Sequence, residues 1–158
     1  MSAARWAVLL GLILAFPADA AGQRGGGFGS GISAGPRAGR DFGNKAWTVG
    51  GQVSLPLGER LELRPSGDLL FPKGERMGWQ LNGDGAIRFG QGGGLYAGGG
   101  FAVARLNGDA DTETGYNLFF GLSTAEPRQQ TKGFIEFRWT FLDGTSPFRL
   151  ALGFLYRL

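Results

Sequence analysis

The sequence predicts an all-β fold: an eight-stranded antiparallel up-and-down transmembrane β-barrel that follows a cleaved N-terminal signal peptide. Three observations predict this fold. Apolar side chains recur at every second position in eight separate segments, rather than with the 3.6-residue period of a helix. Glycine, at 31 of 158 residues, is spread through all of these segments. Charged residues in the segments lie on the face opposite the apolar side chains.

The N-terminus is typical of an export signal. Arg5 provides a positive start, residues 6–16 form an uncharged apolar run, and residues 18–20 (Ala-Asp-Ala) match a small-x-small cleavage site. The apolar run of about eleven residues is shorter than the ~20 residues that a membrane-spanning helix requires. Residues 1–20 are therefore predicted to be a signal peptide for the general secretory pathway. Residues 21–158 are predicted to form a single barrel domain.

The period-two alternation also sets the expected strand ends. It is clearest in the last segment, where Phe148, Leu152 and Phe154 share one face and Arg149 and Ala151 share the other. The predicted strands are 28–34, 47–57, 61–71, 79–89, 95–103, 116–122, 135–141 and 148–158. Pro65 lies inside the third strand. Because a closed barrel has no edge strand to hide a missing N–H, we expect a β-bulge at residues 65–67.

The contrast between the two faces indicates the surrounding medium. The polar face is rich in small residues, which suit the narrow interior of an eight-stranded barrel. The uncharged apolar face suits contact with lipid, and a closed barrel satisfies its backbone groups inside a bilayer. Because lone buried charges are costly, the interior charges should pair, and Glu136 is expected to pair with Arg88 or Arg149. The predicted interior network is Glu62, Arg64, Asp68, Asp84, Arg88, Glu136, Arg138 and Arg149.

The connections divide into outward loops and periplasmic turns. With the N-terminus on the periplasmic side, the longest outward loops are predicted at 36–46 and 105–114, and the short turns at 58–60 and 90–94 face the periplasm. Arg37, Arg40 and Lys45 make the first outward loop basic. These bases either contact lipopolysaccharide phosphates or a host anion, or they are ordinary charges near the lipid headgroups.

Residue types argue against catalysis and against bound cofactors. The sequence has no histidine and no cysteine. Ser33 lies in a Gly-x-Ser-x-Gly match, but that motif requires a strand-turn-helix context and a general base, and the sequence offers neither. Asp109, Asp111 and Glu113 are weak candidates for a metal site, because their spacing is not that of an EF-hand and a solvated turn is the better explanation for them. The net charge of +3 is too small and too scattered to indicate nucleic-acid binding.

The C-terminus carries the most specific motif. The last six residues contain Gly153, the aromatic Tyr156 and the terminal hydrophobic Leu158. This pattern resembles the assembly signal of the eight-stranded outer-membrane barrel family, which includes opacity-type adhesins. That family usually ends in Phe, and it prefers a polar residue where Ala151 stands here. The resemblance implies folding by the barrel-assembly machinery of the bacterial outer membrane.

The expected function is that of a non-catalytic integral outer-membrane barrel with a structural or surface-interaction (adhesin-like) role. Its expected partners are outer-membrane lipid, lipopolysaccharide and a possible extracellular ligand bound by the loops. Two alternatives stay open: a narrow channel, and a soluble periplasmic lipocalin-like barrel that binds lipid. A packed interior argues against general diffusion through eight strands.

Overall fold

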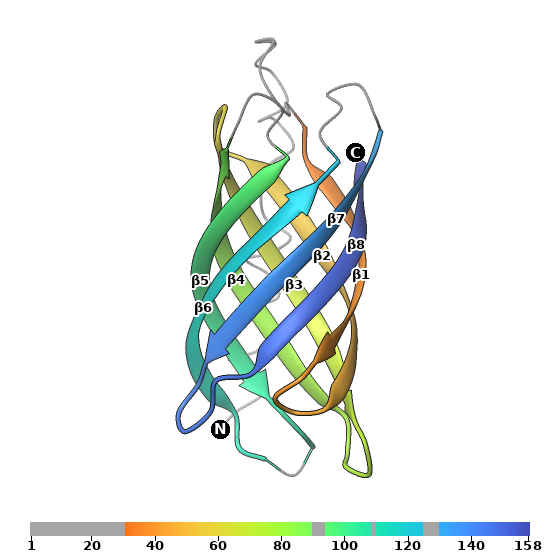
Figure 1. Ribbon diagram of the computed structural model, residues 1–158, viewed down its shortest axis with the longest axis vertical. Coiled ribbons are helices and arrows are strands. Elements are labelled where there is room, and N and C mark those ends of the chain that lie inside the picture. Colours follow the sequence, from red (N-terminus) through yellow and green to blue (C-terminus); the bar gives the residue numbers. More distant parts are fainter. Residues whose placement is uncertain (1–30, 90–93, 109, 125–129) are drawn as a thin grey trace, which may run out of the picture.

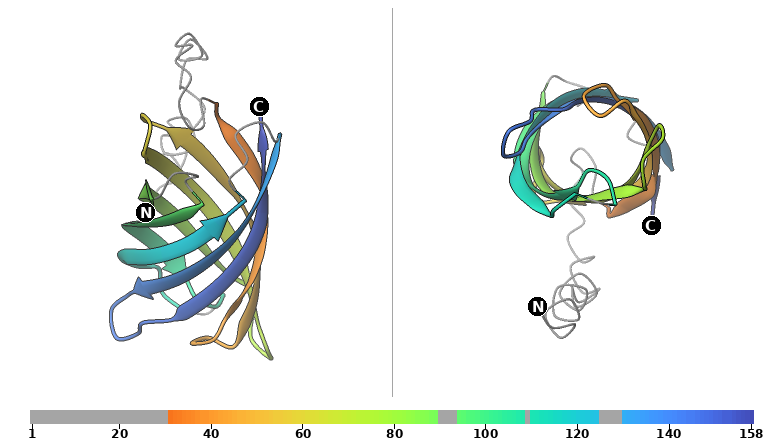
Figure 2. Two further views of the ribbon diagram at one scale, coloured as in Figure 1. Left: turned by 45° about the horizontal axis from the view of Figure 1, so that its top comes forward. Right: turned by 90° about the horizontal axis from the view of Figure 1, so that it is seen from below.

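The computed structural model describes residues 31–89, 94–108, 110–124 and 130–158, and in them eight strands close into one antiparallel barrel. Each strand pairs with its neighbours in sequence, and the last strand pairs with the first, as Figures 1 and 2 show. The strands are β1 (Ser33–Asp41), β2 (Ala46–Pro56), β3 (Leu61–Pro72), β4 (Gly78–Phe89), β5 (Leu95–Arg105), β6 (Glu113–Ser123), β7 (Thr131–Phe141) and β8 (Phe148–Arg157). The predicted signal peptide, residues 1–20, lies outside the described residues. No helix in the described part of the chain is long and apolar enough to cross a membrane.

The barrel has two ends, which we call the terminal rim and the distal rim. At the terminal rim β1 begins and β8 ends; at the distal rim lie the turns 42–45, 73–77, 106–112 and 142–147, of which residue 109 is not described. In Figure 1 the terminal rim is at the top and the distal rim at the bottom. The predicted outward loops fall at the distal rim.

Alternate residues of every strand point inward and outward. The phases predicted for the strands that hold Trp47, Trp79 and Trp139 are confirmed, because the polar neighbours of these residues are buried in the barrel. Large apolar side chains such as Leu81, Phe120 and Leu152 are exposed on the outside, at roughly half of their full surface. A water-soluble protein seldom exposes a continuous apolar surface of this kind.

The outer surface differs from one side of the barrel to the other. On β6, β7 and β8 it carries aromatic rings in close pairs, most of them stacked, with the centroids of each pair 4.8–6.4 Å apart. These rings are Tyr116, Phe120, Phe137, Trp139, Phe141 and Phe148. On β2, β3 and β4 small residues replace the rings in the middle of the wall, where Gly51 pairs with Gly67 and Gly85 pairs with Gly99 on β5.

The prediction for the first strand is wrong. β1 runs over Ser33–Asp41, whereas the predicted strand was 28–34, of which residues 28–30 lie outside the described residues. Most of the predicted loop 36–46 is therefore strand, and only 42–45 form the turn. The outward residues of β1 include Ala34, Pro36 and Ala38, which are too small to produce an apolar alternation. Pairing with β2 and β8 on either side positions this strand.

The predicted bulge at Pro65 is also wrong. The β2–β3 ladder runs without a gap to the pair Gln52–Ser66 and resumes at Leu55–Leu63 in the same register. On its other side Pro65 pairs with Gly83 in an unbroken ladder. The missing N–H therefore interrupts pairing toward β2 alone, and no extra residue is inserted into the strand.

Candidate functional site: the charged barrel interior

The interior of the barrel is polar and charged along its length. The structure places every residue of the predicted network there, with side chains that are buried or, for Arg88 near the terminal rim, nearly so. Eight strands enclose an interior just wide enough for side chains to fill. The arrangement of these charges therefore determines what the interior can do.

Glu136 on β7 is the centre of the network and is fully buried. Its Oε1 accepts hydrogen bonds from Nε and Nη2 of Arg138 at 3.0 and 2.8 Å. Its Oε2 faces Nη1 of Arg64 at 3.5 Å and accepts a hydrogen bond from the Tyr96 hydroxyl at 3.3 Å. Arg37 lies 3.8 Å from the same carboxylate. The prediction that Glu136 pairs with Arg88 or Arg149 is therefore wrong. Arg88 pairs with Glu62, and Arg149 pairs with Asp41 and Asp68.

A second cluster lies toward the distal rim around Asp68. Arg37 donates two hydrogen bonds to this carboxylate, one of them from Nε at 2.8 Å, and Arg149 donates another at 2.8 Å. Arg149 also reaches Asp41 at 3.2 Å. The sequence-based prediction missed Arg37 and Asp41 because it placed both in a loop. The signal that identifies them is the period-two series 33, 35, 37, 39, 41, which alternates with the small residues Ala34, Pro36 and Ala38 before Arg40.

A third cluster lies toward the terminal rim. Glu62 accepts hydrogen bonds from Nε of Arg64 at 3.1 Å and from Nε of Arg88 at 2.5 Å. Arg88 also donates to the Ser123 hydroxyl at 3.2 Å. Between the clusters Asn117 donates to Asp84 at 2.9 Å, so that neutral side chains continue the network.

The ion pairs cross the barrel from wall to wall. Arg64 on β3 meets Glu136 on β7, the strand diametrically opposite in the ring of eight. Arg138 on β7 meets Asp84 on β4 at 2.7 Å, and Arg149 on β8 meets Asp68 on β3. These contacts tie opposite walls together across the space that a pore would need.

Glycines make room for the interior rings. Each buried ring lies directly across the ladder from a glycine: Tyr96 from Gly121, Phe119 from Gly98, and Phe134 from Gly153. A Cβ at any of these glycines would come within 2.5–2.6 Å of the ring opposite. The Arg64 guanidinium in turn lies 3.9 Å from the centre of the Tyr96 ring, a cation–π contact that is stronger away from water.

Replacing Gly121 with alanine is expected to lower the free energy of unfolding by about 1–3 kcal/mol, the usual cost of overpacking. The added Cβ would meet the Tyr96 hydroxyl at 2.5 Å and the Ile135 carbonyl at 2.4 Å. Gly85→Ala is the matched control, since its nearest neighbour is 3.9 Å away on the outer surface. Urea unfolding in detergent micelles measures the free energy of unfolding of both variants. Equal stability of the two variants would contradict the packing argument.

Among the residues that the structure describes, the candidate catalytic and metal residues are not grouped into a site. Ser33 is buried within β1, in extended strand rather than at a strand-to-helix turn. Asp109 lies outside the described residues, Asp111 is in the turn 106–112, and Glu113 begins β6. Within the residues that the structure describes, no three acidic, histidine or cysteine side chains are grouped as metal ligands.

The residues of the predicted assembly signal lie at the closing seam between β8 and β1. Gly153 pairs with Arg37 on β1 and with Phe134 on β7, and Tyr156 pairs with Ala34 and Thr131. The Tyr156 side chain is exposed on the outer surface. The backbone N–H of Leu158 donates to the Ile32 carbonyl at 2.9 Å, so the last residue still contributes to closure.

Comparisons with known proteins show the fold. The structure is similar to the crystal structure of the N-terminal β-barrel domain of Pseudomonas aeruginosa OprF, with a TM-score of 0.66 at 19% sequence identity, covering 80% of this chain and 96% of that domain. It is also similar to a de novo designed transmembrane β-barrel, with a TM-score of 0.54 at 11% identity, covering 81% and 95% of the two chains. No protein-family model and no curated protein sequence matches this chain, so membership of the opacity-type family has no support. The fold is that of an eight-stranded outer-membrane barrel.

Proposed function

We propose that this protein is a non-catalytic integral outer-membrane barrel with a closed interior, a structural role in the membrane, and its distal rim facing the outside of the cell. The observation that carries the proposal is the inverted distribution of polarity. Fully buried arginines and carboxylates fill the inside, while exposed leucine, phenylalanine and tryptophan cover the outside. Only a lipid environment makes this distribution favourable over the whole barrel wall.

The interior argues against the soluble lipid carrier. A pocket for a lipid chain is lined mainly by apolar side chains with few polar groups. Here the largest fully buried side chains are headed by Arg64 and Arg138, and Glu136 lies between them. Admitting a hydrocarbon chain would separate these paired, buried ions, which is costly, so the carrier alternative is disfavoured.

The interior also argues against a channel for general diffusion. Ion pairs link β3 to β7 and β8, and β4 to β7, across the interior. A solute would have to break several paired, buried charges in succession. Purified protein in a planar bilayer is therefore expected to show no stable open conductance.

A surface-interaction role rests on the turns at the distal rim. The first of them is shorter than predicted, since only residues 42–45 connect β1 and β2. The turn at 106–112 is the longest at this rim and carries Asp111. We propose that any extracellular ligand contacts this turn, so deletion of 107–111 should abolish such binding and leave the barrel closed.

The membrane location is tested by labelling. Single cysteines are introduced at Leu81, which points outward, and at Ala86, which is buried inside, and the protein is folded into lipid vesicles. An environment-sensitive maleimide probe at 81 is expected to report an apolar environment and to be quenched by quenchers on the lipid chains. Quenching at 86 instead, or at neither position, would overturn the proposal.

A role of Tyr156 in recognition by the assembly machinery is testable because it is separable from folding. Tyr156→Ala is expected to reduce insertion in cells about tenfold while the purified variant still folds in detergent, since its ring packs outside the barrel. A tenfold loss corresponds to about 1.4 kcal/mol of recognition free energy. Phe154→Ala removes another exposed ring from the same strand and is the control. Equal insertion of the two variants would remove Tyr156 from the signal.

A further inference from the structure

The charges inside the barrel are balanced in its deeper part and unbalanced at one end. In the deeper part, four carboxylates form ion pairs with four arginines: Asp41, Asp68, Asp84 and Glu136 with Arg37, Arg64, Arg138 and Arg149. At the terminal rim, the inner faces of the strands carry the carboxylate of Glu62 and the cations of Arg88, Lys132 and Arg157, which we call the terminal mouth. The terminal mouth therefore has an excess of two positive charges.

Strand pairing places the two outermost cations on the inner face of the barrel. Lys132 on β7 lies directly across the ladder from Leu155 and two residues before Phe134, and both of these side chains are buried. Arg157 on β8 lies across from Ser33 of β1, which is also buried. Residues opposite each other in a ladder share a face of the sheet. Lys132 and Arg157 therefore approach the terminal mouth from two adjacent strands.

The single carboxylate of the terminal mouth is already engaged by arginines. Glu62 forms ion pairs with Arg88 and with Arg64. Within the part of the chain that the structure describes, no carboxylate lies at ion-pair distance from the half-buried Lys132. The charges that act on Lys132 come from three arginines and one acid: Arg88, Arg157, Arg64 and Glu62. Because water screens half-buried charges only partly, the repulsion among these cations favours the binding of an anion.

The interior below the terminal mouth is filled. The side chains of Tyr96, Phe134 and Leu155 are buried there, and the Arg64 guanidinium lies 3.9 Å from the centre of the Tyr96 ring. An eight-stranded barrel is just wide enough for such side chains. The terminal mouth is thus a shallow site for a small anion, which cannot pass further into the barrel.

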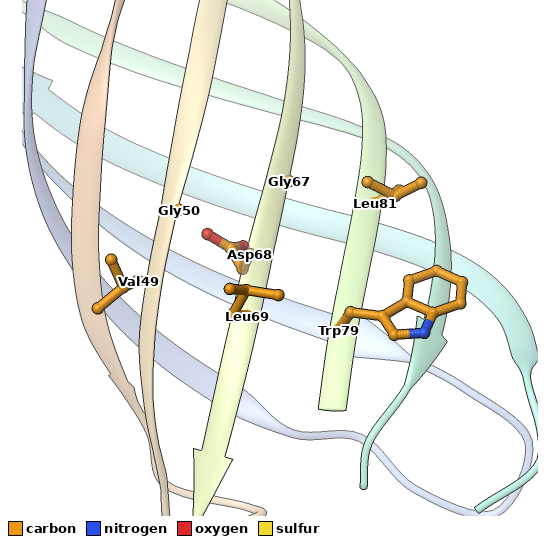
Figure 3. Close-up of a pocket in the computed structure, with 7 residues that line it drawn as sticks. All are labelled: Val49, Gly50, Gly67, Asp68, Leu69, Trp79 and Leu81. Carbon is orange, nitrogen blue, oxygen red and sulfur yellow. The ribbon is translucent and has the colours of Figure 1, made fainter. Parts of the chain in front are cut away.

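The hollow on the outer wall over β2, β3 and β4 has a different character. Val49, Leu69, Trp79 and Leu81 line it with apolar side chains (Figure 3). Asp68 is the only charged residue among those that line it, and its carboxylate is already paired with arginines in the interior. An anion would find no cation among the lining residues of this hollow. The terminal mouth is therefore the better anion site.

We propose that the terminal mouth binds one small oxyanion with two negative charges, a phosphate group, between Arg88, Lys132 and Arg157. The excess of two positive charges selects a doubly charged anion. Guanidinium and ammonium groups suit its oxygens because they donate charge-assisted hydrogen bonds. In the orientation proposed above, the terminal mouth opens to the periplasm. The phosphate is then either free inorganic phosphate or the phosphate of a small solute. The side of the membrane rests on the proposed function, whereas the binding itself does not.

Isothermal titration calorimetry tests the site on the folded chain without its predicted signal peptide, in detergent and at constant ionic strength. At about pH 8 a phosphate group is doubly charged, since its second pKa is about 6. We expect one phosphate per barrel, and Lys132→Gln should lower the affinity about tenfold, as expected for the loss of a charged hydrogen bond. Lys132→Arg keeps the charge and should bind as the unmodified protein does. Lys73→Gln removes one positive charge from the exposed turn at the distal rim and should also leave binding unchanged.

The choice of anion identifies the ligand. Inorganic phosphate, glycerol phosphate and nitrate are titrated in turn. Tighter binding of inorganic phosphate assigns the site to the free anion, and comparable or tighter binding of glycerol phosphate assigns it to a phosphorylated solute. Nitrate carries one negative charge and should bind much more weakly, so equal binding of nitrate would overturn the doubly charged oxyanion.

Failure of this site is distinguishable from failure of the proposed function. All variants are first checked for heat-modifiable gel migration, which reports a closed barrel. Binding of neither phosphate, or an equal loss in Lys132→Gln and Lys73→Gln, would overturn the site and leave the membrane location untouched. If phosphate binds as expected but the label at residue 81 fails to sense lipid, the site stands and the membrane location fails.

Discussion

Glu136→Gln is expected to lower the free energy of unfolding by about 3–5 kcal/mol, the usual cost of removing one partner from a buried ion pair. The substitution keeps the shape of the side chain and removes its charge. Arg138, Arg64 and Arg37 all approach this carboxylate, at 2.8, 3.5 and 3.8 Å, so three buried cations lose a counter-charge together. Arg138 keeps Asp84, and this second partner should prevent complete unfolding.

Equilibrium unfolding in urea, with the protein in detergent micelles or thin vesicles, measures this loss. Glu59→Gln is the control, since Glu59 is exposed in the turn between β2 and β3. It should change stability by less than about 0.5 kcal/mol. A Glu136→Gln protein as stable as this control would mean that the interior is hydrated enough to screen its charges, and the closed-interior proposal would then fail.

Gly83→Arg is expected to destabilise the inserted barrel by about 2–4 kcal/mol, the cost of an arginine on the lipid face near the bilayer midplane. Gly83 lies mid-strand in β4 on the outer face, and a Cβ there meets no atom within 4 Å. The new side chain therefore breaks no packing. Any decrease in the free energy of unfolding of this variant therefore comes from placing the arginine charge in lipid.

The matched control occupies the same position. Gly83→Leu adds an apolar side chain in the same open space and should leave the stability of the inserted protein unchanged or slightly higher. Both variants are folded into lipid vesicles at increasing urea concentrations, and their free energies of unfolding are compared. Tolerance of arginine together with loss of stability on adding leucine would show that water, not lipid, surrounds this wall.

The sequence by itself determined the architecture and which face of each strand is apolar. Strands with large outward side chains, such as Trp79, Phe120 and Phe137, were predicted in their observed phase. The physical reason is that a barrel wall with an apolar outer surface has an apolar residue at every second position of each strand. That alternation can be read from consecutive residues of one segment. The predicted interior residues followed from the same alternation, since the positions between outward residues face inward.

The tertiary structure alone decided how the charges pair and where β1 lies. Glu136 meets Arg138 and Arg64 rather than Arg88 or Arg149. The stagger of the strands determines which side chains lie at the same height along the barrel axis, and no local sequence pattern encodes that stagger. β1 has no large apolar residue to mark it, so its position depends on hydrogen bonds to β2 and β8. Pro65 fits without a bulge because its neighbours hold the register on both sides of the interruption. Each of these features depends on contacts between residues far apart in the chain, which form only when the barrel closes.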